Sequence, residues 1–388
     1  MPSSVCAIVP TYNRAQMLRE CLDSILAQTR AVQDLVVVND GSGDETASVV
    51  KSYGGSVRLI SKDNGGKSSA LNLAMRSCTS DYVWICDDDD IAASDGLEHL
   101  VAALDSNKTA GFAYGTFQIF RDDALGRHYT PPTYWMRDGE PNVHIQFLEE
   151  MFTFQYAMLV PRSLYAKVGS FREDLIRCQD HEMAIRLARN ALSIYVPRVI
   201  FFQRAHFGLR GGLNNPIPIE LNAQKFLEED QKVIASIYKE YNLEEFTPTF
   251  ARHWDPVRAR RAALVERACV CAKNALWREA IDDFREANEL SRARAAPEEI
   301  RLAEAVIRSP LPWDIVGKNP DLISGLRAIH DANKYGHHII HAACRPIVWQ
   351  ARHMFWNGDI QAGVTRLRTL AGILGAQGAL RRLQESLF

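Results

Sequence analysis

Short apolar runs, each ending in a polar turn, mark strands in the first ninety residues. The runs cover residues 5–9, 34–39 and 82–86, and Pro10, a turn at 40–44 and a run of aspartates follow them in that order. Between the first two runs, apolar residues recur at helical spacing, namely Leu18, Cys21, Leu22, Ile25 and Leu26. Strand, helix and strand in this order form a right-handed crossover, so the pattern predicts a doubly wound, mostly parallel α/β sheet flanked by helices.

Four consecutive aspartates, Asp87 to Asp90, follow the third apolar run. Adjacent carboxylates repel one another unless a cation holds them, and open α/β sheets bind ligands at the carboxyl ends of their strands. Hard oxygen ligands favour Mg²⁺ or Mn²⁺, which in such a crevice neutralise a diphosphate. The alternative is a solvated acidic turn.

Polar residues also follow the first two strands. Tyr12 and Asp40 would offer a nucleotide base an apolar ring and a hydrogen-bond acceptor. As alternatives, Tyr12 covers the edge of the sheet, and Asp40 forms an Asx turn with Gly41 and Ser42. The two roles of Asp40 are compatible.

A third stretch, Asn64-Gly65-Gly66-Lys67, has no side chain at two positions, so its backbone amides can approach a ligand closely. Lys67 adds a positive charge, which suits a diphosphate or a ribose. Glycine pairs mostly mark turns, however, and a lysine is by default solvated. Arg14 likewise has two interpretations, a phosphate ligand or a surface arginine.

These motifs carry a resemblance to a known family. Residues 10–14, 39–46 and 64–72, followed by the aspartate run, resemble in order and spacing the family 2 glycosyltransferases of the GT-A fold. The resemblance covers roughly residues 4–210, a little over half of the chain. It implies a GT-A-like (Rossmann-like) α/β domain that binds a nucleotide-sugar donor.

The resemblance also assigns donor-side residues. It implies Asp89 as the main metal ligand, with Asp90 supporting the site, although four identical side chains leave the register uncertain by one residue. The late segment 203–212 resembles the loop that folds over the donor phosphates, where His206 would contact the metal or the diphosphate. The residues expected to bind the nucleotide or donor are Pro10, Thr11, Tyr12, Arg14, Asp40, Gly66, Lys67, Asn72, Asp87, Asp88, Arg204 and Arg210.

Residues 169–174 and 178–187 resemble the acceptor-side part of the family, in which a Glu-Asp pair begins a helix. Asp180 stands at the position of the general base that takes the proton from the acceptor hydroxyl. Gln179 replaces the glutamate, so a neighbour that would tune the base is neutral here. The alternative interpretation of Asp180 is a helix N-cap.

The second half of the chain changes character, because strand signals stop near Pro216 and helical patterns dominate. We therefore expect a catalytic domain at 1–215 and an all-α C-terminal domain at 216–388. Residues 277–287 resemble half of a tetratricopeptide hairpin, but the spacing to a fainter copy near 358–370 does not fit the repeat, so no array is predicted. The segment 337–356 mixes cationic and aromatic residues, which fits either an anionic bilayer surface or a packed helix with a cationic outer face.

Composition narrows the class of protein. The net charge of −2 argues against a general nucleic-acid binder, and the eight cysteines show neither zinc-site nor disulfide spacing. No apolar run is long enough to span a membrane, and the chain enters a strand without a signal peptide. We therefore expect a cytoplasmic protein, with a peripheral contact at the inner face of the membrane left open. The oligomeric state is open as well.

Together these features predict a metal-dependent, inverting glycosyltransferase. Its donor would be a nucleotide-diphosphate sugar, most readily a UDP-sugar, and its acceptor a hydroxyl of a saccharide or lipid-linked saccharide, with Mn²⁺ or Mg²⁺ as cofactor. A nucleotidyltransferase would carry a basic glycine-rich loop after the first strand, and an aspartate-based phosphatase a small hydroxyl residue where Ile91 stands. The remaining alternative is a sugar-nucleotide-binding or scaffold protein with a weakened site and an interacting helical tail.

Overall fold

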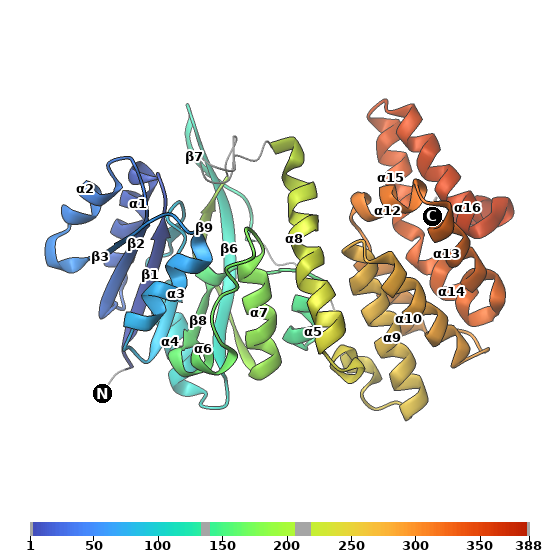
Figure 1. Ribbon diagram of the computed structural model, residues 1–388, viewed down its shortest axis with the longest axis horizontal. Helices are drawn as coiled ribbons and strands as arrows, with labels where there is room; N and C mark the ends of the chain where they lie inside the picture. The colour runs from blue at the N-terminus through green and yellow to red at the C-terminus, as the bar shows by residue number, and fades with distance from the viewer. Residues whose placement is uncertain (1–2, 133–139, 206–218, 386–388) are drawn as a thin grey trace. The chain divides into compact units, whose positions relative to one another are not determined.

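The computed structural model describes residues 3–132, 140–205 and 219–385. The chain divides into two compact units (Figure 1). The first comprises Met1–Met136 and Glu150–Ala223, and the second comprises Arg137–Glu149 and Gln224–Phe388. The predicted domain boundary after residue 215 lies outside the described residues.

A mixed sheet forms the centre of the first unit. Its strands run in the order β3-β2-β1-β4-β8-β6-β9-β5, with β7 paired to β6. The strands are β1 (Val5–Thr11), β2 (Asp34–Asp40), β3 (Arg58–Lys62), β4 (Tyr82–Ile85), β5 (Ile91–Ala92), β6 (Phe112–Asp123), β7 (Gly126–Tyr129), β8 (Met158–Pro161) and β9 (Ser193–Arg204).

The half of the sheet predicted from the apolar runs is parallel. β1 pairs with β2 on one side and β4 on the other, and β2 pairs with β3, all in parallel. Beyond β4 the sheet is mixed, because β8 runs antiparallel to both β4 and β6 while β6 and β9 are parallel. The α/β fold is confirmed, and the carboxyl ends of β1, β2 and β4 meet at one edge.

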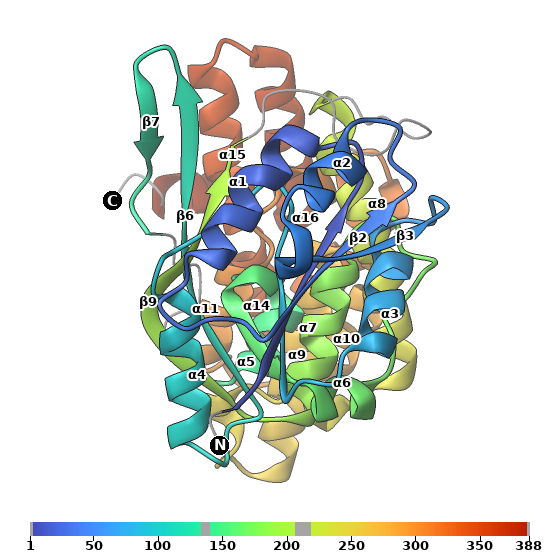
Figure 2. The same ribbon diagram turned by 90° about the vertical axis from the view of Figure 1, so that its left-hand side faces the viewer.

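Helices cover both faces of this sheet (Figure 2). Alternate residues of β1, namely Val5, Ala7 and Val9, share one buried cluster with apolar residues of α1, α2 and α4. The opposite face receives α3, which packs on β1 and β2, and α6, which packs on β8. The helices are α1 (Ala15–Leu26), α2 (Thr46–Lys51), α3 (Lys67–Ser77), α4 (Gly96–Ser106), α6 (Arg162–Val168) and α7 (Gln179–Asn190).

The second unit is helical in the part of the chain that the structure describes, as predicted. Neighbouring helices pack as pairs, α9 with α10, α13 with α14 and α15 with α16. Its helices are α5 (Val143–Glu149), α8 (Ile219–Glu240), α9 (Pro256–Lys273), α10 (Trp277–Glu289), α11 (Pro297–Val306), α12 (Pro310–Gly317), α13 (Pro320–Ala332), α14 (Lys334–Ala343), α15 (Arg345–Trp356) and α16 (Ile360–Glu385). The segment α5 joins this unit through Glu149, whose carbonyl accepts a hydrogen bond from Lys273.

Buried ion pairs tie the helices of this unit together. Arg267 of α9 makes two hydrogen bonds to Asp283 of α10, at 2.7 and 2.8 Å. Arg261 pairs with the fully buried Glu299, which also accepts a hydrogen bond from Tyr335. All eight cysteines of the chain are buried. No helix among the described residues combines the length and hydropathy that a bilayer crossing requires.

The segment 337–356 is mostly packed. Ile339, Ile340, Ile347 and Val348 are buried, which fits the interpretation as packed helices with a cationic outer face. Its C-terminal end nevertheless exposes Trp356.

Candidate active site

Two strand-end loops are locked together at the edge where the parallel strands end. Asn13 adopts a left-handed backbone conformation at φ 53°, and its N–H donates to Ser42 Oγ at 2.9 Å. The Asn13 side chain accepts in return from the Gly43 N–H at 2.8 Å, and Asn39 accepts from Ser42. The turn after β1 is therefore fixed against the turn after β2.

The first strand delivers Pro10 and Thr11 into this edge as buried residues, and Tyr12 follows half-buried. These positions fit the predicted contact with a nucleotide base. That contact stays a prediction.

Asp40 is buried and its carboxylate is engaged within the protein. Lys62 Nζ lies 2.6 Å from Oδ1, and the backbone N–H groups of Gly65 and Gly66 donate to the two oxygens at 2.9 and 2.8 Å. Asn64 adds a fourth donor at 3.2 Å, so the four lone-pair positions of the carboxylate are occupied. Asp40 therefore shapes the 64–67 loop directly, and a role in base recognition stays a prediction.

Two glycines permit this arrangement. A side chain at Gly41, where φ is +79°, would place its Cβ 2.7 Å from the Asn64 backbone nitrogen. Gly66, at φ +88°, leads into α3, which begins at Lys67. The sequence reasoning found Gly66 but missed Lys62, whose only signal was its place at the end of β3.

The four aspartates of the run after β4 share three partners. Lys67 Nζ lies 2.5 Å from Asp87, and Arg14 Nη1 lies 2.8 Å from Asp88 and 2.5 Å from Asp89. Asp90 accepts a hydrogen bond from the backbone N–H of Arg204 at 2.8 Å. The predicted residues Arg14, Lys67 and the four aspartates are thus brought into one cluster.

Burial and mutual repulsion disfavour full ionisation of this cluster. Burial, together with the charge of Asp89, raises the pKa of Asp88 to about 6 even though Arg14 acts to lower it. Burial followed by the charges of Asp89 and Asp87 raises the pKa of Asp90 well above its usual range. Arg14 is shared by Asp88 and Asp89, and Lys67 pairs with Asp87, so four ionised carboxylates would carry two more charges than these two cations.

This charge excess fits a divalent cation. Among the described residues, no group of three His, Cys, Asp or Glu side chains is arranged to hold a metal by itself. Mg²⁺, however, usually binds one or two protein carboxylates and completes its shell with substrate phosphates and water. Asp89 and Asp90 suit that requirement, whereas His206 lies outside the described residues.

Arg204 ends β9 beside the cluster, and its guanidinium joins a second group of charges. Its Nε donates to the Asp89 carbonyl at 3.0 Å, while its other nitrogens pair with Asp122 at 2.6 Å and Glu20 at 3.1 Å. The guanidinium also stacks on Phe120, at 4.6 Å from the ring centroid. The predicted phosphate contact of Arg204 stays a prediction, and Arg210 lies outside the described residues.

Asp180 lies in the first turn of α7. The N-cap of this helix is Cys178, in a left-handed conformation at φ 59°, and Asp180 itself accepts a hydrogen bond from the His181 N–H at 2.9 Å. Asp180 is therefore a residue of the first turn and not the cap.

Asp180 also lies close enough to Lys67 to influence it. Burial alone would lower the pKa of the Lys67 ammonium, but the carboxylates of Asp87 and Asp180 outweigh burial and raise it. Lys67 therefore links the aspartate cluster to the start of α7.

Part of the N-terminal unit matches a known family. Residues 6–169 match the profile of "Glycosyl transferase family 2". The N-terminal unit belongs to glycosyl transferase family 2.

Curated relatives of this family 2 unit match it over about half of the chain. An uncharacterised glycosyltransferase of Rickettsia felis is 32% identical over 206 residues, which are 52% of this chain and 34% of the relative. The chondroitin synthase of Pasteurella multocida is 27% identical over 250 residues, 62% of this chain and 24% of that protein. The chain thus spans about a third of the first of these relatives and a quarter of the second.

A solved structure matches the family 2 unit together with helices beyond it. TarS of S. aureus, residues 1–349 in complex with UDP-GlcNAc, aligns over 92% of each chain with a TM-score of 0.54 and 17% sequence identity. At this identity the likeness concerns the fold, and it confirms a GT-A-like domain followed by a helical region.

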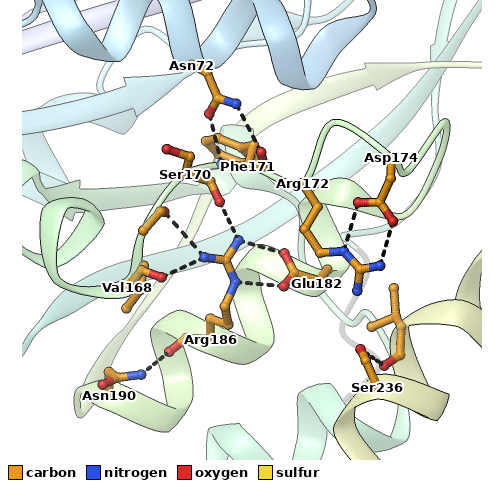
Figure 3. Close-up of polar contacts among 12 residues, drawn as sticks. Asn72, Val168, Ser170, Phe171, Arg172, Asp174, Glu182, Arg186, Asn190 and Ser236 are labelled. Carbon is orange, nitrogen blue, oxygen red and sulfur yellow. Dashed lines mark hydrogen bonds and ion pairs between the residues drawn. The ribbon is translucent and has the colours of Figure 1, made fainter.

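One predicted donor residue, Asn72, is engaged elsewhere. Its side chain on α3 donates to the Phe171 carbonyl at 2.9 Å and accepts from the Phe171 N–H at 2.8 Å (Figure 3). It also donates to Glu173 at 2.8 Å. Both ends of the amide therefore hold the loop before α7, and a donor contact by Asn72 stays a prediction.

Gln179, which stands where the family carries glutamate, is buried at 8% exposure. Its side-chain oxygen accepts no hydrogen bond from any described residue. A buried acceptor in that state costs about 1–3 kcal/mol. Sequence reasoning identified the replacement, and only the structure located its orphaned oxygen next to Asp180.

Proposed function

We propose that this family 2 glycosyltransferase moves a sugar from a nucleotide-diphosphate donor, a UDP-sugar, to a hydroxyl of a saccharide or glycoconjugate with inversion. The observation that carries the proposal is the position of Lys67. Its ammonium pairs with Asp87 of the donor-side cluster and is influenced by the carboxylate of Asp180 on α7. Groups suited to the two substrates of a transfer reaction therefore both act on one lysine.

In the proposed reaction, Asp180 accepts the proton of the acceptor hydroxyl. The hydroxyl oxygen attacks the anomeric carbon from the face opposite the diphosphate, a new C–O bond forms, and the bond from the anomeric carbon to the diphosphate oxygen breaks. The diphosphate leaves with the electron pair, and a single displacement inverts the anomeric centre. Asp180 then releases its proton to solvent.

The charges of the cluster suit the donor half of this reaction. Lys67 and Arg14 lie where they would favour the departing negative charge, and preorganised cations of this kind stabilise a transition state more than a ground state. Bound Mn²⁺ or Mg²⁺, held by Asp89 and Asp90, would neutralise the diphosphate. Asp87 and Asp88 would lie nearer the nucleotide.

The proposal extends to the organisation and surroundings of the chain. We assign catalysis to residues 1–215 and a supporting role to the helical domain at 216–388, in a protein that works in the cytoplasm. On α15, Trp349 and Trp356 are exposed by 49% and 90%, and the helix carries Arg345 and Arg352 but no acidic residue. Exposed tryptophans with basic neighbours favour peripheral contact with an anionic membrane, where a lipid-linked saccharide would be met.

The deciding experiment separates donor binding from transfer. Calorimetry with UDP, GDP, CDP and ADP, each with Mn²⁺ or with chelator, is expected to reveal metal-dependent binding of UDP. Asp89→Asn should abolish that binding. Asp180→Asn should retain it and lose transfer. The absence of binding to any nucleotide would favour the scaffold alternative, and transfer by the Asp180 variant would remove its assignment as the base.

A further inference from the structure

A single arginine of α7 holds the end of α6 and the loop that follows it. Arg186 Nη1 donates to the carbonyls of Val168 and Gly169 at 2.7 and 3.3 Å, and Nη2 donates to the Ser170 carbonyl at 2.9 Å (Figure 3). Nε and Nη2 also bind the two carboxylate oxygens of Glu182, both at 2.7 Å. These contacts use all five N–H groups of the guanidinium.

The geometry of this loop needs such support. Gly169 has φ +91°, and three successive carbonyl groups converge on one point. A lysine in place of Arg186 would keep the charge opposite Glu182 but would lack the planar fork that reaches the carbonyls and the carboxylate together.

The same loop is held from its other side by α3. Asn72 pairs with both the N–H and the carbonyl of Phe171, one residue beyond the last carbonyl bound by Arg186. Phe171 is buried at 3% exposure, so these backbone groups have little access to water. Losing the amide would leave two buried polar groups without partners, at about 1–3 kcal/mol each.

The two helices that hold the loop also carry the two halves of the site. α3 begins at Lys67, so Asn72 follows the lysine on the same helix, and α7 carries Asp180 ahead of Arg186. The loop therefore joins the helix of the donor-side cation to the helix of the acceptor-side carboxylate.

We propose that Asn72 and Arg186 are positioning residues for the transfer reaction, which fix the start of α7 relative to α3 so that Asp180 faces the site beside Lys67. This inference rests on the proposed function. It assigns to Asn72 a role different from donor binding, and to Arg186 a role that the sequence did not indicate. Neither residue touches the substrate.

Turnover of the full-length chain provides the first test. Arg186→Lys should lower kcat about 10- to 100-fold, since a displacement near 1 Å costs on that order. The Kd for UDP with Mn²⁺ should change less than about twofold, because the aspartate cluster is untouched. Asn72→Ala should lower kcat in the same way. Arg76→Lys, an exposed arginine on α3, is the matched control and should leave both quantities unchanged.

The kcat is calculated per UDP-binding site, so that misfolded protein does not lower its value. If the Arg186 and Asn72 variants lose melting temperature but keep the wild-type kcat per binding site, both residues are merely structural and the inference fails. If either variant loses UDP binding in proportion to turnover, a positioning role is likewise overturned.

Hydrogen exchange supplies a readout that does not depend on activity. In Arg186→Lys and Asn72→Ala, the amides of residues 169–182 should exchange about tenfold faster than in the wild type, with β1 and β2 unchanged. Unchanged exchange in this segment would overturn the inference. A wild type that transfers no sugar from any UDP-sugar would instead overturn the proposed function, and the exchange data would still decide whether the two residues hold the loop.

Discussion

Lys67 Nζ lies 2.5 Å from the carboxylate of Asp87, and this contact joins the first residue of α3 to the end of β4. The contact is partly exposed, at 27% for Lys67 and 28% for Asp87. An anionic ligand entering from solvent can therefore reach the ammonium.

We expect Lys67→Met to weaken binding of UDP with Mn²⁺ about 10- to 100-fold, measured by calorimetry. The change removes a charged contact worth about 1.5–3 kcal/mol, and a tenfold change in Kd corresponds to about 1.4 kcal/mol. Lys67→Arg should retain most of the affinity. An unchanged Kd in the methionine variant would place the nucleotide elsewhere.

Gln179→Glu should move the acidic limb of the pH dependence of kcat/KM to higher pH. The new carboxylate would lie beside Asp180 in a position only 8% exposed, and its charge would disfavour the ionised form of the proposed base. A higher pH is then needed before the base can accept a proton. An unshifted limb would mean that another group takes the proton, and Gln179→Met serves as the uncharged comparison.

The buried ion pair between Arg267 and Asp283 should contribute strongly to the stability of the helical unit. Burial raises the pKa of Asp283 despite its arginine partner. Arg267→Met would strand that carboxylate at 3% exposure and should lower the free energy of unfolding by about 3–5 kcal/mol in urea titrations.

The neighbouring pair of Arg285 and Asp282 is the matched control. These side chains are exposed by 52% and 66%, so Arg285→Met should cost less than about 1 kcal/mol. Equal losses in the two variants would contradict the difference in burial.

Acidification should destabilise the helical unit through His341. Burial, with Arg382 adding to it, lowers the pKa of this imidazole to about 4. The unfolded chain binds a proton near pH 6.5 and the folded chain does not, so this contribution to stability is complete above pH 6.5 and is lost as the pH falls towards 4. The melting temperature of His341→Gln should therefore fall less than that of the wild type between pH 7 and pH 5, and parallel falls would refute the assignment.

Exposed tryptophans on α15 should report membrane contact directly. Sedimentation with vesicles of phosphatidylglycerol and phosphatidylcholine should recover the wild type, with a blue shift of tryptophan emission, and Trp356→Ser should recover less. Leu125→Ser, at a residue 89% exposed in the other unit, is the control. Equal recovery of all three proteins, or none of any, would contradict the proposed contact.

The parallel half of the sheet could be predicted because β1, β2 and β4 are buried apolar runs, each of which is followed by a turn. β6 and β9 could not, because β6 ends in exposed polar residues, β9 is exposed at Tyr195, Pro197 and Arg198, and a register shift near Gly115 breaks the alternation between the two strands. The place of α5 with the helical unit depends on contacts such as Glu149 with Lys273, which lie far apart in the sequence.

For the site, several of its residues could be predicted from the sequence, but their hydrogen-bond and ion-pair partners could not. The aspartate run, Lys67 and Asp180 were recognised from motifs. In the structure Lys67 contacts Asp87, and the charge of Asp180 influences Lys67. The contacts of Asp40 with Lys62 and of Asn72 with Phe171 could be found only in the structure, because nothing in the sequence spacing of either pair indicates contact.

Four chemically identical side chains follow β4, and they meet three different partners, namely Lys67, Arg14 and the backbone N–H of Arg204. The contacts that each aspartate makes depend only on its position in the turn. Inserting or deleting one residue in this turn would leave its composition and charge nearly unaltered while shifting the carboxylates by one position relative to their partners. A change in length should therefore harm the proposed transfer reaction more than any single replacement within the run.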